Sequence, residues 1–165
     1  VHKASIATNA YVRGLRVCNN EIHGGFAESG IFSFFFAGDA VRVDLTGFTS
    51  DGANTPILPG DIVLDGNVIH TNKHNAVASV SDVGIHFIGP AGATLENVSI
   101  SNNSLSDTGN GDGTTSFGAL NLDINDPVIN LKVDGNLINS PPTNGVYINS
   151  SGQLRVVSVS GNQID

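Results

Sequence analysis

The 165-residue sequence contains one cysteine, no methionine and no tryptophan, and only 13% of its residues are charged. The single cysteine, Cys18, excludes an internal disulfide. Seven lysines and arginines against fifteen acidic residues give a net charge of -8, which argues against nucleic acid as a partner because nucleic-acid-binding surfaces are strongly basic. Apolar runs of membrane-spanning length are missing, so we expect no membrane insertion.

The short motifs of several large enzyme classes are also missing. The sequence has no phosphate-binding glycine loop, no nucleophile elbow, and neither a CxxC nor an HExxH motif. Nucleotide enzymes, serine hydrolases and zinc proteins therefore have no support. Amphipathic stretches of helical period are missing too, so we expect little helix. These absences leave glycan chemistry and scaffolding as the favoured classes of function.

The sequence does contain a repeat of eight residues: apolar, any, apolar, any, any, Asn, any, apolar. Six segments fit it, with Thr46 replacing Asn in the second: LRVCNNEI (15–22), VRVDLTGF (41–48), IVLDGNVI (62–69), VSISNNSL (98–105), LKVDGNLI (131–138) and VSVSGNQI (157–164). The Asn positions recur after 26, 21, 36, 33 and 26 residues, which is the range of a solenoid coil. Each copy predicts a strand, a bend at Asn and a second strand, and the stacked Asn side chains predict an internal ladder.

A second element precedes most copies and consists of Gly followed by an alternating strand, at Gly30, Gly84, Gly118 and Gly145. Together the two elements resemble the right-handed parallel β-helix repeat of the pectate-lyase-like superfamily. The resemblance implies an all-β fold, a right-handed single-stranded parallel β-helix (a solenoid) of about six coils with an internal Asn ladder. It implies less about activity, because that superfamily includes polysaccharide lyases, glycosidases, epimerases and bacteriophage tailspikes.

We expect one β-helix domain over residues 1–165. The repeats run to both ends of the sequence, and the end coils of a solenoid expose core and strand edges unless something caps them. The sequence is therefore expected to be a segment of a longer chain that lacks its end caps, or to be capped by partner subunits.

The residues four and two positions before each Asn are expected to point outward and to align in rows when the coils stack. One row contains Arg16 and Arg42, and the other contains Asp44 and Asp65 on neighbouring coils. Since neighbouring strands lie roughly 4.8 Å apart, these carboxyls match the separation of about 5 Å in retaining glycosidases. We predict Asp44 and Asp65 as a catalytic pair and both arginines as sugar contacts. Alternatively, the arginines only neutralise the carboxylates as exposed ion pairs.

The Gly strands supply a further outward row, with Phe32, His86, Leu120 and Tyr147 two positions after each Gly. Aromatic and imidazole faces suit sugar rings, so Phe32, His86 and Tyr147 are predicted substrate contacts. For the phenylalanines the alternative is a subunit interface, because the segment 31–36 (IFSFFF) is apolar on both sides. We therefore expect a homotrimer packed along this face.

Loops of variable length commonly build the binding surface of a solenoid. Two insertions stand out, 49–61 and 70–82, and the second carries His70 and His74, which suit proton transfer or anion contact. The segment 107–113 (DTGNGDG) matches an EF-type calcium loop poorly, because its first and twelfth ligand positions are not acidic. No cofactor is required by the resemblance, and calcium stays open as an alternative.

These features favour a protein that binds and degrades polysaccharide by glycosidic hydrolysis and is similar to the body of a bacteriophage tailspike or capsule depolymerase. The expected partner is a bacterial surface or other polysaccharide, and the expected location is extracellular or on a virion surface. Two alternatives stay open. One is a secreted bacterial polysaccharide lyase or uronate epimerase, and the other is a non-catalytic structural or adhesive solenoid.

Overall fold

The computed structural model describes residues 4–8, 13–23, 39–45, 59–72, 83–90, 92–108, 118–139, 141 and 144–165. These residues form fifteen β-strands and no helix, as the sequence predicts. Within them, accordingly, no helix is long and apolar enough to cross a membrane.

The strands belong to three five-stranded sheets in which all paired strands are parallel. Sheet A contains β1 (Ala4–Thr8), β4 (Asp39–Asp44), β7 (Ile85–Ile88), β10 (Gly118–Ile124) and β13 (Asn144–Ser150). Sheet B contains β2 (Arg16–Cys18), β5 (Gly60–Asp65), β8 (Leu95–Ser101), β11 (Val128–Asp134) and β14 (Leu154–Ser160). Sheet C contains β3 (Glu21–His23), β6 (Val68–Asn72), β9 (Ser104–Thr108), β12 (Leu137–Asn139) and β15 (Gln163–Ile164).

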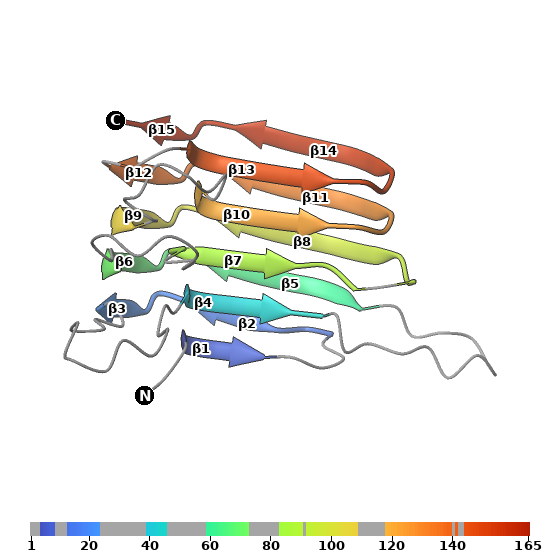
Figure 1. The fold of residues 1–165 in the computed structure, drawn as a ribbon, viewed down its shortest axis with the longest axis horizontal. Coiled ribbons are helices and arrows are strands. Elements are labelled where there is room, and N and C mark those ends of the chain that lie inside the picture. The colour runs from blue at the N-terminus through green and yellow to red at the C-terminus, as the bar shows by residue number, and fades with distance from the viewer. Residues whose placement is uncertain are drawn as a thin grey trace, which may run out of the picture.

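The described strands visit sheets A, B and C in turn, so three consecutive strands form one layer. Five layers are stacked from β1–β3 to β13–β15, so that β1 and β15 lie at opposite ends of the stack (Figure 1). The all-β class and the parallel sheets predicted from the repeat are therefore confirmed. The described residues contain five layers, where the repeat predicts about six coils.

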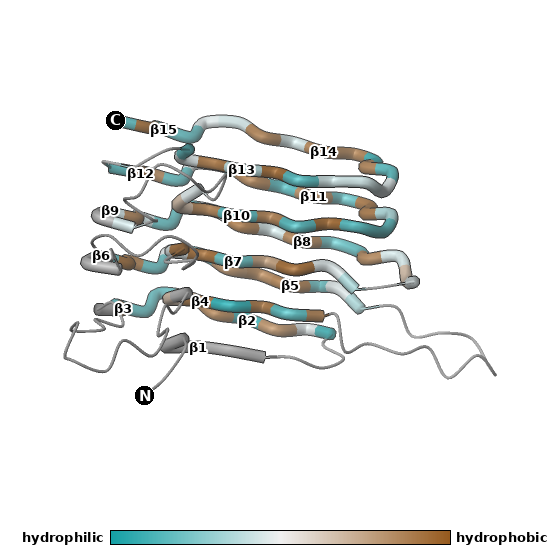
Figure 2. The backbone as a smooth tube through the Cα atoms, in the orientation of Figure 1, coloured by the Kyte–Doolittle hydropathy of each residue, from teal (hydrophilic) through white to brown (hydrophobic). Residues whose placement is uncertain are grey.

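An apolar core lies between the sheets and runs through the layers, because the strands alternate with a period of two (Figure 2). In β5, for example, Ile62 and Leu64 are fully buried, whereas the alternate residues Val63 and Asp65 are only partly buried. Each fully buried aliphatic side chain of this kind stabilises the fold by about 1.5–3 kcal/mol.

The predicted Asn ladder is present at the bend between sheets B and C, and its rungs are Asn20, Asn67, Asn103, Asn136 and Asn162. The Nδ2 of each of the first four rungs donates to the Oδ1 of the next at 2.9–3.0 Å. The backbone N–H of the same rung donates to the same oxygen. In the middle rungs the second Nδ2 hydrogen is donated to a backbone carbonyl. Their buried amides are therefore fully hydrogen-bonded.

The segment 41–48 is not a rung of this ladder, which corrects the sixfold repeat. β4 lies in sheet A, where Val41 is paired with Ile85. Strands of sheets A and B share the same alternation of apolar residues, so only the Asn distinguishes them, and this copy has Thr46 instead. Thr46 itself lies outside the described residues. Consecutive rungs are separated by 47, 36, 33 and 26 residues.

A residue in the left-handed conformation precedes every rung of the ladder. These residues are Asn19, Gly66, Asn102, Gly135 and Gly161, with φ between 54° and 66°. Gly and Asn adopt this conformation at the lowest cost. Gly66 and Gly135 also meet a steric limit, because a Cβ atom there would lie 2.5 Å and 2.8 Å from an Asn Oδ1 of the preceding layer. The bend therefore depends on the residue before each rung as well as on the rung.

Candidate functional site

A row of polar side chains crosses the outer face of sheet A. β4, β7, β10 and β13 are in register there, so Arg42, His86, Asn121 and Tyr147 occupy one position on successive strands. The residues on either side of this row are buried in β4, β7 and β10, and Val146 and Ile148 beside Tyr147 are partly buried. Three of the predicted sugar contacts are therefore brought together on one face.

The next outward row of sheet A contains two carboxylates. Asp44 on β4 and Asp123 on β10 are both paired with Ile88 on β7, the strand between them. The Nη2 of Arg42 donates to Oδ2 of Asp44 at 2.8 Å. The side chains of Asp44 and Asp123 are 16% and 23% exposed, so each carboxylate is partly accessible.

Asp123 is the centre of a hydrogen-bond network. Its Oδ2 lies 3.1 Å from Nε2 of His86 and accepts from Nδ2 of Asn121 at 2.9 Å, and its Oδ1 accepts from Nδ2 of Asn149 at 3.2 Å. His86 is 5% exposed and Asn121 is fully buried. Oδ1 of Asn121 is buried and has no hydrogen-bond partner. A poorly hydrated environment strengthens the His86–Asp123 contact.

The sequence-based assignment misses Asn121 and Asp123 because it places β10 one residue out of register. Gly118 is paired with Asn144 rather than with Gly145. Leu120 therefore points into the core and is fully buried, which corrects its expected outward position. The signal was present in the alternation of Leu120, Leu122 and Ile124, which predicts that the two residues between them face outward.

The predicted pair of Asp44 and Asp65 is not formed. Asp44 lies in sheet A, and Asp65 lies in sheet B, where its register partners are Cys18 and Ser101. The expected separation of one strand spacing is wrong because β4 does not belong to sheet B. The proposed role of Asp65 as a partner of Asp44 therefore loses its geometric basis.

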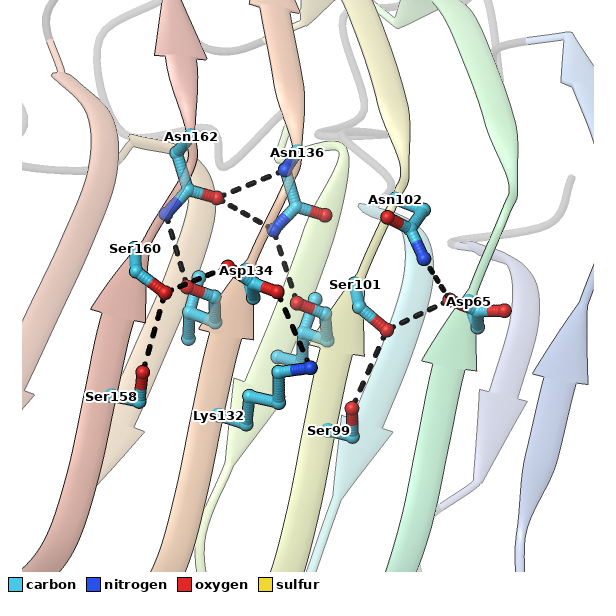
Figure 3. Close-up of polar contacts among 12 residues, drawn as sticks. Asp65, Ser99, Ser101, Asn102, Lys132, Asp134, Asn136, Ser158, Ser160 and Asn162 are labelled. Carbon is cyan, nitrogen blue, oxygen red and sulfur yellow. Dashed lines mark hydrogen bonds and ion pairs between the residues drawn. The ribbon is translucent and has the colours of Figure 1, made fainter.

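Asp65 instead belongs to an outward row of sheet B in which acid and serine alternate (Figure 3). The row contains Cys18, Asp65, Ser101, Asp134 and Ser160. Oγ of Ser101 donates to Oδ1 of Asp65, and Oγ of Ser160 donates to Oδ1 of Asp134, both at 2.7 Å. Both carboxylates therefore accept a hydrogen bond from a serine hydroxyl of the same sheet.

Asp134 also forms an ion pair with Lys132. Nζ of Lys132 lies 3.2 Å from its Oδ2. The hydrogen bond from Ser160, followed by the hydrogen bond and charge of Lys132, lowers the pKa of Asp134 below its ordinary value of 3.8. Asp134 is therefore held as a carboxylate at neutral pH, which suits a structural contact better than proton donation.

An open, shallow groove of about 480 Å³ crosses the outer face of sheet B. Its lining residues come from β2, β5, β8 and β11 and are Arg16, Asp61, Val63, Asn97, Val98, Ser99, Asn130 and Lys132. The structure therefore separates Arg16, a predicted sugar contact, from the other contacts that it gathers on sheet A. The eight-residue repeat does not include Asp61, Asn97 and Asn130, which is why sequence reasoning misses them.

Several predicted features lie outside the described residues. They are Phe32 and the rest of the segment 31–36, His74, and residues 109–113 of the segment that was compared with a calcium loop. The trimer face and calcium therefore stay predictions. His70 is described, and its Nε2 lies 3.5 Å from Oε1 of Glu21 on sheet C. Within the described part of the chain, no group of three or more His, Cys, Asp or Glu side chains is placed to hold a metal ion.

Comparison of the chain with known protein families, with curated proteins and with solved structures finds no match. The likeness to the pectate-lyase-like superfamily therefore rests on the repeat alone.

Proposed function

We propose that the protein is a right-handed parallel β-helix that binds polysaccharide and hydrolyses it on the outer face of sheet A. The passage of the chain through three parallel sheets in turn supports the β-helix. Right-handed connections between parallel strands of one sheet are strongly preferred in proteins, which supports the hand. The repeat supports a likeness to tailspikes and capsule depolymerases.

The observation that carries the hydrolytic proposal is the placement of Asp44 and Asp123 in one outward row, two strands apart. Two strand spacings amount to roughly 9.5 Å. Inverting glycosidases separate their two carboxyl groups by about 6.5–9.5 Å, which leaves room for a water molecule beside the sugar. The spacing therefore favours inversion, whereas the sequence alone pointed to a retaining pair.

The surrounding contacts suggest a role for each group. Arg42 fixes the direction of Asp44, which acts as the base and accepts a proton from the attacking water. The proton for the glycosidic oxygen comes from the imidazolium of His86 and reaches that oxygen through Asp123, whose Oδ2 lies 3.1 Å from Nε2 of His86. Tyr147, in the same row as His86, offers a flat face to a sugar ring.

The test is hydrolysis of a panel of bacterial surface polysaccharides by the Asp44→Asn and Asp123→Asn variants. Each should lower the rate by at least about 100-fold, because a positioned acid or base contributes that much. Asp65→Asn, which changes a carboxylate on sheet B, is the matched control and should keep the activity. Proton NMR of the first product should show inversion at the anomeric carbon. Full activity of both sheet A variants would refute the proposal.

The burial of His86 and Asn121 favours a second candidate, a non-catalytic adhesive solenoid in which the sheet A network only rigidifies the fold. Wild-type protein that binds polysaccharide and releases no product would establish this candidate. A lyase or epimerase would leave a different signature. Formation of unsaturated uronate, seen as ultraviolet absorbance, would identify a lyase, and altered uronate stereochemistry without cleavage would identify an epimerase.

A further inference from the structure

Charge is distributed unevenly between sheet B and the rest of the chain. We count the five strands of sheet B together with Arg13, whose backbone pairs with Gly60 of β5. This surface contains four of the seven cationic residues of the chain and four of its fifteen acidic residues. These residues are Arg13, Arg16, Lys132, Arg155, Asp61, Asp65, Glu96 and Asp134. Sheet B is therefore neutral, and the net charge of -8 resides elsewhere. An anionic ligand meets less repulsion here than on an average face of the molecule.

Arg16 differs from the other three cationic residues of this sheet. The others contact side-chain oxygens of Asp61 and Glu96 (Arg13), Asp134 (Lys132) and Gln153 (Arg155), at 2.8–3.6 Å. Arg16 is exposed, lines the groove, and has no side-chain partner among the described residues. Its planar guanidinium is therefore available to bind a carboxylate through two parallel hydrogen bonds.

A line of hydrogen-bonded side chains follows one side of the groove. Asp61, Asn97 and Asn130 share the left-handed conformation, with φ of 53°, 54° and 62°. Nδ2 of Asn97 donates to Oδ1 of Asp61, and Nδ2 of Asn130 donates to Oδ1 of Asn97, both at 2.8 Å. Each amide uses only one of its two donor hydrogens in these bonds, so the other is available for a hydroxyl group.

We propose that this groove is a second glycan-binding site, separate from the hydrolytic site on sheet A, and that it takes an oligosaccharide with widely spaced carboxylates. Arg16 binds one carboxylate, and the amides of Asn97 and Asn130 and the hydroxyl of Ser99 bind sugar hydroxyls. The ligand lies across β2, β5, β8 and β11, so it follows the direction in which the layers stack. A densely charged polyanion is disfavoured, because Arg16 is the only described cationic residue of sheet B without a side-chain partner and the whole chain is acidic.

Three probes of different charge density test this proposal by isothermal titration calorimetry. They are oligosaccharides of hyaluronan, in which carboxylated and neutral sugars alternate, neutral dextran, and densely sulfated heparin. Hyaluronan should bind most tightly and should weaken as salt is raised. Arg16→Gln should lower its affinity at least about tenfold, because a charge-assisted, bidentate contact is lost. Arg155→Gln, which removes an equal charge from the same sheet, should change the affinity less than about twofold.

Equal losses in the two arginine variants would overturn the proposal, since they would reflect net charge alone. Preference for heparin or dextran, or no binding of hyaluronan, would overturn it as well. The Asp44→Asn variant separates this proposal from hydrolysis, because Asp44 lies on sheet A. That variant should bind hyaluronan as the wild type does, and a parallel loss of binding would contradict two separate sites.

Discussion

A single hydroxyl group lowers the pKa of Asp134 on sheet B. Asp134 receives a hydrogen bond from Ser160 one layer further on, and this bond is the main reason for its lowered pKa. Because the folded state holds the proton less tightly than the unfolded state, Asp134 stabilises the fold above its ordinary pKa of 3.8. The contribution is lost as the pH falls through the lowered folded-state pKa.

Replacing Ser160 by alanine tests this account at the residue scale. Ser160→Ala should raise the pKa of Asp134 toward its ordinary value, because the largest stabilising contact of the carboxylate is removed. The carboxyl ¹³C shift of Asp134, followed by NMR from acid to neutral pH, measures the change directly. Ser101→Ala is the matched control, because Ser101 donates to Asp65 instead, and should leave the Asp134 titration in place. An unchanged titration in Ser160→Ala would assign the shift to Lys132.

At the scale of strands, the left-handed position on the outer side of sheet B recurs in four of them. It is occupied by Asp61, Asn97, Asn130 and Val156 in β5, β8, β11 and β14. Val156 has φ of 54° and is 75% exposed. A β-branched residue is strained in this conformation by about 1–2 kcal/mol, and Val156 cannot extend the amide line of the two asparagines.

We expect Val156→Asn to stabilise the protein by about 1 kcal/mol, because Asn tolerates the left-handed conformation and its Nδ2 would reach Oδ1 of Asn130. Differential scanning calorimetry would show the gain as a higher Tm. Val156→Gly separates the two contributions, since it relieves the strain without supplying the hydrogen bond, and it should raise the Tm less. A lower Tm for Val156→Asn than for the wild type would contradict this interpretation of the strand.

The elements also show how far the sequence predicts the fold. The Asn at each bend is a specific signal, because a buried amide must be hydrogen-bonded and the repeat supplies identical neighbours. All five Asn rungs predicted from the sequence are therefore present. Alternation alone is not specific, because strands of sheets A and B bury the same pattern of residues. The segment 41–48 fitted the alternation without the Asn, and β4 lies in the other sheet.

The candidate site was less predictable because it depends on register. Moving Asp44 from one sheet to another replaces its expected neighbour Asp65 with Asp123 as the nearest carboxylate in its row. A shift of one residue in β10 also exchanges Leu120 for Asn121. A register error of one residue moves every side chain of a strand to the other face of the sheet. A site assembled from several strands is therefore harder to predict than the core.

At the largest scale, the described strands are stacked in five layers, so the stability of a layer depends on the layers next to it. Val98, Leu131 and Val157 occupy one inward position on β8, β11 and β14. Val98, with paired strands on both sides, is 1% exposed, and Val157 in the last layer is 40% exposed. The same side chain at equivalent positions is therefore fully packed in one layer and half covered in another.

This difference predicts unequal costs for the same substitution in the two layers. Val98→Ala should lower the free energy of unfolding by about 2 kcal/mol, because it removes buried methyl groups and leaves a cavity. Val157→Ala should cost less than about 1 kcal/mol, because part of the side chain is already in water. Urea unfolding of the two variants, monitored by circular dichroism, measures both costs. Equal costs would mean that the last layer is covered in solution, since only then would the two valines lose the same packing.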